Sequence, residues 1–281
     1  MSSVAPSLFR HIAACRNAVL PGARLPFRLG PHRVGWVLPD FAERVLAEGA
    51  RDGVRRDEGC VVLDDPAALP RLGRRLADRG TYRWRDEAFD VRAEPGGPVL
   101  AHLDRGALPS FGVLAEGVHL NGLVRRPDGP WLWVGRRAAH KRLDPGKFDH
   151  IVGGGVPAGL DADAALLKEA EEEASLPPDL ARRARRVATL SYAMERPEGL
   201  RRDRLHCYDL DLPDAFTPRP ADGEVDGFEL WPLPAVLDRV RRTDDFKFNV
   251  NLVLLDLFLR EGLIDPAGEE GRRLRAGLDA A

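Results

Sequence analysis

Residues 153–176 read GGGVPAGLDADAALLKEAEEEASL, and this stretch decides the fold. Three consecutive glycines at its start predict a tight turn, because glycine tolerates backbone conformations that other residues avoid. The residues after the turn have helical periodicity, and a side-chain oxygen of Asp161 or Asp163 can cap the first turn of the helix. The apolar residues that fall on one side of this predicted helix are Leu166, Leu167, Ala170 and Ala174.

Another side of the predicted helix carries acidic residues. Glu169, Glu172 and Glu173 are separated by three and four positions and therefore converge, whereas Glu171 falls outside this trio. Carboxylates held close together repel one another, and a hard divalent cation with oxygen ligands relieves that repulsion. The pattern therefore indicates a site for Mg²⁺, with Mn²⁺ as the alternative ion. A solvated acidic face is the competing interpretation, and it is the commoner one for a bare run of glutamates.

The spacing of these residues resembles the signature of the Nudix hydrolases. That signature is a glycine, then a glutamate, then R-E-U-x-E-E-x-G-U, in which U is a bulky aliphatic residue. Gly154 takes the place of the glycine, fifteen residues before Glu169. Three positions depart from the signature: its first glutamate is Leu160, its arginine is Lys168 and its last glycine is Ser175. The first two are paired by a salt bridge in the family, so their joint loss leaves the metal-facing glutamates in place. Ser175 lies where a helix often ends with positive φ.

The resemblance implies a fold and a mechanism. We expect an α+β protein with a Nudix α/β/α sandwich around a mixed sheet. The metal ion is expected on Glu169, Glu172 and Glu173, assisted by the backbone carbonyl of Gly154 and by the carboxylate of Glu224. These residues form the predicted catalytic site, in which Glu169 or Glu224 acts as the general base for attack of water on phosphorus. A simple turn residue in the sequence Asp-Gly-Glu is the alternative interpretation of Glu224.

Basic residues crowd the loop after a predicted hairpin. Alternation from Val118, a Pro-Asp-Gly turn at 127–129 and a return through Val134 predict two antiparallel strands. Arg136 ends the second strand and Lys147 lies in the loop beyond it. We predict that both neutralise the diphosphate of the substrate. Solvated loop charge is the competing interpretation.

The chain is expected to divide near residue 112. Residues 1–112 form a smaller α/β domain of undefined function, residues 113–265 the Nudix hydrolase domain, and residues 266–281 a C-terminal tail that is a short helix or frayed. The first domain is expected to shape specificity or to complete a homodimer interface. Its predicted elements are strands near 33–38, 61–63, 82–84 and 88–92, and helices after Pro39 and Asp65.

Composition limits the partners of this protein. The 281 residues carry a formal net charge of −2 at pH 7, which favours neither a nucleic-acid nor a membrane partner. Cys15, Cys60 and Cys207 are few and far apart, so they indicate no disulfide framework and fit a reducing compartment. The arginine-bearing N-terminus resembles a transit peptide weakly. Because Leu8 and Ile12 have the spacing of core residues, we expect a folded start and a cytoplasmic protein.

Segments outside the signature narrow the resemblance to one Nudix subfamily. They are RVGWV at 33–37, GVHLNG at 117–122, PGKFD at 145–149 and CYDLDLP at 207–213. Members of this subfamily carry an N-terminal domain of undefined function and some are fused or related to thiamine pyrophosphokinase. Some hydrolyse thiamine diphosphate, or its oxidised analogues, to the monophosphate. The resemblance therefore implies a hydrolase of a small-molecule diphosphate, with these compounds as the best candidates.

Three alternatives are open at this point. One is a Nudix pyrophosphatase that acts on ADP-ribose, NADH or similar nucleoside diphosphate derivatives. Another is a diphosphate-binding module without catalysis, although the intact glutamate trio argues against it. The third is isopentenyl diphosphate isomerase, which has a similar PG-x-x-D segment. That enzyme places a cysteine shortly after the segment, where this chain reads HIVG at 150–153, so isomerisation is disfavoured.

Overall fold

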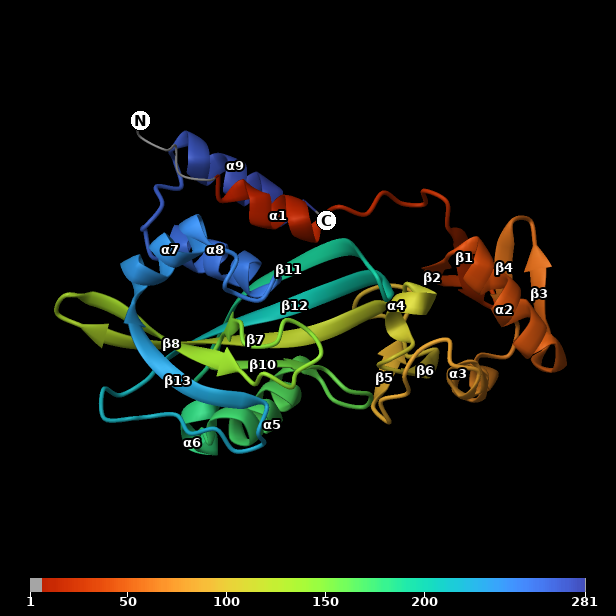
Figure 1. The fold of residues 1–281 in the computed structure, drawn as a ribbon, viewed down its shortest axis with the longest axis horizontal. Coiled ribbons are helices and arrows are strands. Elements are labelled where there is room, and N and C mark those ends of the chain that lie inside the picture. The colour runs from red at the N-terminus through yellow and green to blue at the C-terminus, as the bar shows by residue number, and fades with distance from the viewer. Residues whose placement is uncertain (1–6, 281) are drawn as a thin grey trace.

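The structure, a computed structural model, describes residues 7–280. Its central feature is a seven-stranded sheet with the order β11-β12-β7-β8-β13, in which β10 pairs with β7 and β9 pairs with β8 (Figure 1). Strands β12 and β7 run parallel and the other paired strands run antiparallel, so the sheet is mixed. The bounds are β7 Leu114–Arg126, β8 Gly129–Arg137, β9 Phe148–Asp149, β10 Val152–Gly155, β11 Arg185–Arg196, β12 Gly199–Asp211 and β13 Val225–Pro232.

Strands β7 and β8 pair only near the turn that joins them. Their register runs from Arg126 opposite Gly129 to Leu123 opposite Leu132, which confirms the predicted hairpin. Beyond that point β10 occupies the edge of β7, and β9 pairs with the far end of β8. The two long strands therefore separate, and residues 148–155 fill the opening between them. This opening brings the glycine-rich strand β10 to the middle of the sheet.

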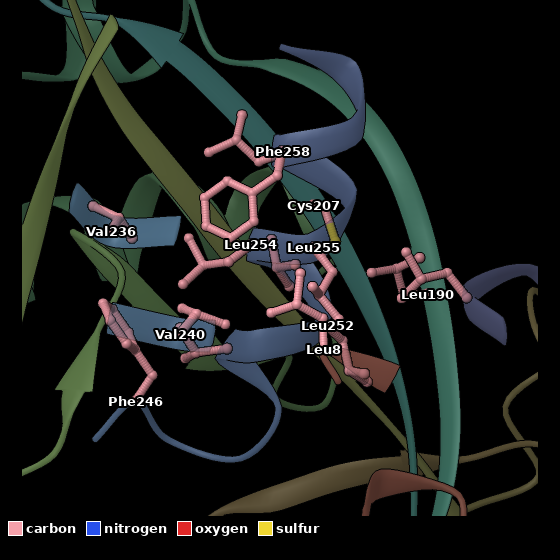
Figure 2. Packing of buried hydrophobic residues seen from close by; sticks show 14 of the residues in the cluster. Leu8, Leu190, Cys207, Val236, Val240, Phe246, Leu252, Leu254, Leu255 and Phe258 are labelled. Atoms are coloured by element: carbon pink, nitrogen blue, oxygen red, sulfur yellow. The ribbon is translucent and has the colours of Figure 1, made fainter. Parts of the chain in front are cut away.

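Helices cover both faces of the sheet, which gives the predicted three-layer α/β/α sandwich of the α+β class (Figure 1). Helices α5 and α6 cover one face, and helices α1, α7, α8 and α9 cover the other. Figure 2 shows side chains of α8, among them Leu254 and Phe258, packed against residues such as Leu190 and Cys207 of the sheet. The bounds are α1 Phe9–Cys15, α5 Ala162–Ala174, α6 Pro178–Ala181, α7 Leu233–Arg242, α8 Val250–Arg260 and α9 Glu269–Asp279.

The N-terminal unit is a smaller α/β structure with its own core. A four-stranded sheet of order β2-β1-β4-β3 packs against α2 and α3, and the hairpin β5–β6 lies toward the large sheet (Figure 1). The bounds are β1 Leu25–Leu29, β2 His32–Val37, α2 Pro39–Gly49, η1 Ala50–Asp52, β3 Val54–Asp57, β4 Cys60–Leu63, η2 Pro66–Ala68, α3 Leu69–Asp78, β5 Ala88–Val91, β6 Ala101–Asp104 and α4 Leu108–Phe111.

Most elements predicted for this unit are confirmed, and one is wrong. The strands near 33–38, 61–63 and 88–92 and both helices are present. Residues 82–84 form no strand, because the Tyr82 hydroxyl donates a hydrogen bond to the Gly73 carbonyl at 2.7 Å and the segment folds over helix α3 instead of joining a sheet.

The two ends of the chain belong to the large domain, which corrects the predicted boundaries. Leu8, Ile12 and Cys15 are buried in the core beneath α8 and α9, so helix α1 is not part of the N-terminal unit. Helix α9 is held against α8 by Arg275, whose guanidinium donates to the buried Asp256 carboxylate at 2.6 Å. Helical periodicity reveals an apolar face but not the core that this face covers.

Within residues 7–280, no helix has the length and apolar content that a membrane span requires.

Candidate active site

Helix α5 begins and ends as the local sequence dictates. The Asp161 side chain accepts a hydrogen bond from the backbone N–H of Ala164 at 2.7 Å, which satisfies one of the free donors of the first turn. Ser175 ends the helix in the left-handed conformation, with φ of 49°, as expected for the position of the signature's last glycine. The Ser175 hydroxyl donates to the Arg219 carbonyl at 3.0 Å. These contacts fix the helix and its glutamates relative to the sheet.

Two glutamates of α5 face strand β10. The Glu173 carboxylate accepts a hydrogen bond from the backbone N–H of Gly153 at 2.8 Å and is only 6% exposed. Glu169 packs on the bare Cα of Gly154, where an added Cβ would lie 2.3 Å from the Glu169 carboxyl carbon. A glycine at position 154 is therefore required for the carboxylate to occupy this place. Glu172 differs from both, because its side chain is 48% exposed and pairs with Lys168 Nζ at 2.6 Å.

Burial makes both of these carboxylates hard to ionise. It raises the pKa of Glu169 from 4.5 to about 7, and the charges of Glu172 and Glu224 add to this effect. Burial also raises the pKa of Glu173 from 4.5 to about 8, against the opposing hydrogen bond from Gly153. A bound cation would stabilise the ionised forms that burial disfavours.

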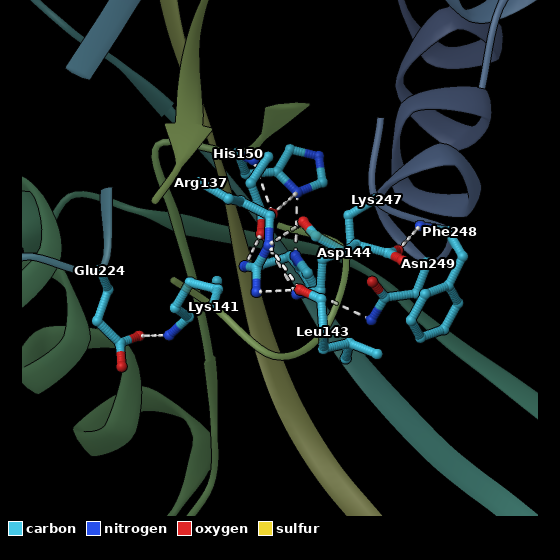
Figure 3. Close-up of polar contacts among 12 residues, drawn as sticks. Arg137, Lys141, Leu143, Asp144, His150, Glu224, Lys247, Phe248 and Asn249 are labelled. Atoms are coloured by element: carbon cyan, nitrogen blue, oxygen red, sulfur yellow. Dashed lines mark hydrogen bonds and ion pairs between the residues drawn. The ribbon is translucent and has the colours of Figure 1, made fainter. Parts of the chain in front are cut away.

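A third element completes the group of carboxylates. The loop before β13 places Asp222 and Glu224 beside helix α5, and oxygen atoms of Glu173, Asp222 and Glu224 lie within 4.8 Å of one another. Glu224 forms an ion pair with Lys141, which lowers the pKa of Glu224 although burial opposes this (Figure 3). Carboxylate oxygens in such an arrangement are the ligands that Mg²⁺ and Mn²⁺ prefer. Asp222 was not predicted, because in sequence it reads as an ordinary turn residue.

The strand geometry distinguishes two neighbouring glycine carbonyls. In an antiparallel pair of strands, the backbone groups of successive residues point alternately toward the partner strand and away from it. The N–H of Gly153 points away from β7 toward Glu173, and its carbonyl lies on that same side. Gly154 pairs with Val118, so its carbonyl faces β7. The role of the Gly154 carbonyl as a ligand stays a prediction, and this geometry favours the Gly153 carbonyl in its place.

The two predicted phosphate-binding residues lie on the side of the sheet that bears α7. The Arg136 guanidinium lies 4.8 Å from the ring centroid of Phe148 and donates to the Gly146 carbonyl at 3.2 Å. Lys147 Nζ lies 3.9 Å from the nearest carboxylate oxygen of Asp144. Lys141, from the same loop as Lys147, pairs with Glu224 of the carboxylate group.

A buried polar cluster lies next to Gly153 of strand β10, and Figure 3 shows Arg137, His150 and Lys247 of this cluster. Asp149 accepts from Arg137 at 2.7 Å and from Lys247 at 3.3 Å. Although burial opposes ionisation, Lys247 and Arg137 hold the pKa of Asp149 well below its usual range. The Cα of Gly153 separates this cluster from Glu173, since an added Cβ would lie 3.2 Å from the Asp149 carboxylate. Arg137 ends β8, Asp149 ends β9 and Lys247 lies just before α8. Their spacing in the sequence did not predict that these three residues pair.

Two histidines complete the cluster. His119 Nδ1 and His150 Nδ1 lie 3.0 Å apart, and the amide nitrogen of Asn249 lies 3.4 Å from His119 Nε2. Burial, and the proximity of the second imidazole, hold the pKa of His119 well below its ordinary value. Burial lowers the pKa of His150 to about 4. Both imidazoles are therefore neutral at pH 7, and they provide hydrogen-bonding groups without charge.

The fold is a three-layer sandwich in which a glycine-rich strand meets a helix that bears glutamates. These features define a class of hydrolases, and comparison with known proteins gives the family. Residues 117–251 match the NUDIX domain. Nudix hydrolase 20, chloroplastic, of Arabidopsis thaliana is 35% identical to this chain. The match covers 94% of this chain and 75% of the length of that relative. Nudix hydrolase 24, chloroplastic, of the same plant is 41% identical over 69% of this chain and 54% of its own length. The crystal structure of DR0079 from Deinococcus radiodurans has 20% identity and a TM-score of 0.45, over 68% of this chain and 98% of that chain. The chain belongs to the Nudix hydrolase family and is a hydrolase that acts on a diphosphate substrate.

Proposed function

We propose that this protein hydrolyses the diphosphate of thiamine diphosphate or of its oxidised analogues, and releases the monophosphate and inorganic phosphate. The observation that carries the proposal is the convergence of Glu169, Glu173, Asp222 and Glu224 beside the glycine-rich strand β10. Support for the thiamine compounds comes from the subfamily segments in β7, β9 and β12, which surround the buried cluster behind this strand.

In this proposal the carboxylates and one backbone carbonyl hold Mg²⁺ or Mn²⁺. The ligands would be drawn from Glu169, Glu172, Glu173, Asp222 and Glu224 and from the carbonyl of Gly153 or Gly154. When bound, such an ion neutralises phosphate oxygens and lowers the pKa of a water molecule. Glu172 would exchange its exposed ion pair with Lys168 for this role, which costs little because exposed pairs contribute about 0–1 kcal/mol.

The protein side chains would supply proton transfer and charge. Glu169 is one candidate for the proton acceptor. Burial raises its pKa from 4.5 to about 7 in the metal-free protein, and a cation bound beside it would lower this pKa. Glu224 is the alternative base, although its ion pair with Lys141 lowers its pKa and makes it a weaker acceptor. Lys141 would be free to contact a phosphate oxygen if Glu224 turned toward the metal.

A substrate panel tests this function. Thiamine diphosphate, its oxidised analogues, ADP-ribose and NADH are each incubated with the protein and Mg²⁺ or Mn²⁺, and the products are separated. Release of inorganic phosphate and a thiamine monophosphate supports the proposal. Selective formation of AMP from ADP-ribose or NADH would replace the substrate while retaining the site. No turnover of any compound would refute catalysis and favour a diphosphate-binding module.

A further inference from the structure

Strand β5 of the N-terminal unit contacts the segment that presents the carboxylates. The backbone N–H of Ala158, between β10 and α5, donates to the Ala88 carbonyl at 2.7 Å. The ring of Phe89 packs on Gly155, where an added Cβ would lie 2.5 Å from a ring carbon. Phe89 is 3% exposed and belongs to the core of the N-terminal unit. One side chain therefore joins that core to the glycine-rich strand of the large domain, and Figure 1 shows the hairpin β5–β6 on the side of the unit that faces the large sheet.

Phe89 and Glu169 lie on opposite faces of β10. Successive residues of a strand direct their side chains to opposite sides of the sheet. A Cβ on Gly154 would meet the carboxyl group of Glu169, whereas the atoms nearest to a Cβ on Gly155 would all belong to the Phe89 ring. The ring therefore supports the strand from the face opposite to the glutamate and keeps it from receding from helix α5.

Strand β10 depends on its neighbours because it has no side chain of its own between Val152 and Val156. Glycine has more backbone freedom than any other residue, so surrounding groups must fix the three consecutive glycines. Pairing with β7 holds one edge of the strand. The other edge presents the Gly153 N–H to the Glu173 carboxylate at 2.8 Å. The place of this donor relative to helix α5 is therefore set by the groups that pack on the two faces of the strand.

The hairpin that carries Phe89 is held in place by a buried carboxylate. Asp104, at the end of β6, is buried and accepts three backbone hydrogen bonds. The donors are Arg85 at 2.9 Å, Gly106 at 2.8 Å and Glu87 at 3.2 Å. Phe89 pairs with Leu103, the residue directly before this carboxylate. Strand β5 is thereby fixed before any ligand binds.

The N-terminal unit is also attached to β12, a strand that does not pair with β10. The Arg202 guanidinium of β12 donates to the Gly112 carbonyl at 3.2 Å. Gly199, which begins β12, lies so close to α4 that an added Cβ would be 2.4 Å from the Pro109 carbonyl oxygen. These contacts hold the unit against the large domain independently of β5, so β5 presses on β10 from a fixed support.

We propose that Phe89 is a positioning residue of this hydrolase, which holds β10 against helix α5 and so keeps the carboxylates in their places around the glycine-rich strand. The N-terminal unit then contributes to catalysis without contacting the substrate. This role concerns the arrangement of the site and does not depend on which diphosphate the protein cleaves.

Amide hydrogen exchange, measured by NMR in the metal-free full chain, tests the position of the strand directly. The reporting amide is that of Gly153, because its acceptor is the Glu173 carboxylate. Phe89→Ala should remove the protection of this amide, since it deletes the ring that supports the strand. Phe89→Leu should retain part of the protection because it refills part of the space. Phe41→Ala is the matched control and should leave the amide protected, since it deletes a ring of the same core that packs on Phe111.

Titration calorimetry with Mg²⁺ measures the consequence for the carboxylates. Phe89→Ala should raise the Kd on the order of tenfold, as is usual when a group that supports metal ligands is lost. Gly155→Ala should raise the Kd as well, because its methyl group would collide with the ring. Phe89→Ala/Gly155→Ala should be no worse than either single variant, because removal of the ring makes room for the methyl group. For any diphosphate that the protein cleaves, Phe89→Ala should lower kcat and leave KM nearly unchanged.

The outcomes separate this inference from the proposed function. Wild-type protection of Gly153, or a wild-type Kd for Mg²⁺, in Phe89→Ala overturns the positioning role. Equal losses in Phe41→Ala also overturn it, because Phe89 would then be an ordinary core residue, and so does a double variant in which the losses of the single variants add. If the wild type binds no Mg²⁺ and cleaves no diphosphate, the proposed function fails. Loss of Gly153 protection in Phe89→Ala but not in Phe41→Ala then still supports the positioning role.

Discussion

Replacement of Glu173 by Gln should stabilise the metal-free protein at high pH. In the folded, metal-free protein, burial raises the pKa of Glu173 from 4.5 to about 8. Below about pH 4.5 the carboxyl is protonated in both the folded and the unfolded chain, so it has no effect on stability. As the pH rises, the unfolded chain ionises first, and the penalty grows until the pH passes the folded pKa. At pH 9 the penalty is about 3–5 kcal/mol, since each pKa step of one corresponds to about 1.4 kcal/mol.

The glutamine side chain removes this penalty and can still accept the hydrogen bond from Gly153. Urea unfolding in the presence of a chelator, at pH 5 and pH 9, measures the difference between the wild type and Glu173→Gln. Glu171→Gln is the matched control, because Glu171 is exposed on the same helix. The variant should gain stability over the wild type mainly at pH 9, and excess Mg²⁺ should reverse the order. Parallel pH dependences of the wild type and Glu173→Gln would refute the assignment of Glu173 as a buried, destabilised carboxylate.

The remaining predictions concern the other side chains at the site. Glu172→Gln should reduce turnover at least about a hundredfold while changing the free energy of unfolding by less than about 1 kcal/mol, because Glu172 is exposed and pairs with the exposed Lys168. Full activity in steady-state assays would contradict its role as a ligand. Gly154→Ala should displace Glu169 and lower activity at little cost in stability, because its Cβ would lie 2.3 Å from the Glu169 carboxyl carbon and the flexible end of that side chain can move away. Wild-type turnover would be inconsistent with this packing. The Kd for Mg²⁺ should fall about tenfold or more between pH 6 and pH 7 and level off above about pH 8. Glu169 and Glu173, with pKa values of about 7 and about 8, must lose their protons to bind the ion. A pH-independent Kd from calorimetry would argue against ligation by these two residues.

Local sequence signals predicted the parts of the fold that depend on nearby residues. The turn at 127–129 joins the predicted hairpin, the helix that carries the glutamates begins at an aspartate cap, and Ser175 adopts the positive φ expected at its position. These features follow from contacts within a few residues, so their signals are contained in short windows of the chain. Predictions failed where a distant contact decided the outcome. Helix α1 joined the core of the large domain, and residues 82–84 folded over α3.

The sequence by itself determined the class of site. Three glutamates at helical spacing after a glycine-rich segment can converge only if the helix forms, and helix geometry is fixed by the backbone. Which of them is buried depended on the sheet: strand β10 receives Glu169 and Glu173 and leaves Glu172 in solvent.

Only the tertiary structure decided which groups from elsewhere join this helix. Asp222 and Glu224 come from the loop before β13, and Lys141 comes from the loop after β8. The sequence positions of these groups carry no information about their mutual distances, because those distances are set by how the strands separate and how two cores pack. The burial that raises the pKa values of Glu169 and Glu173 has the same origin, since desolvation arises from atoms that are distant along the chain.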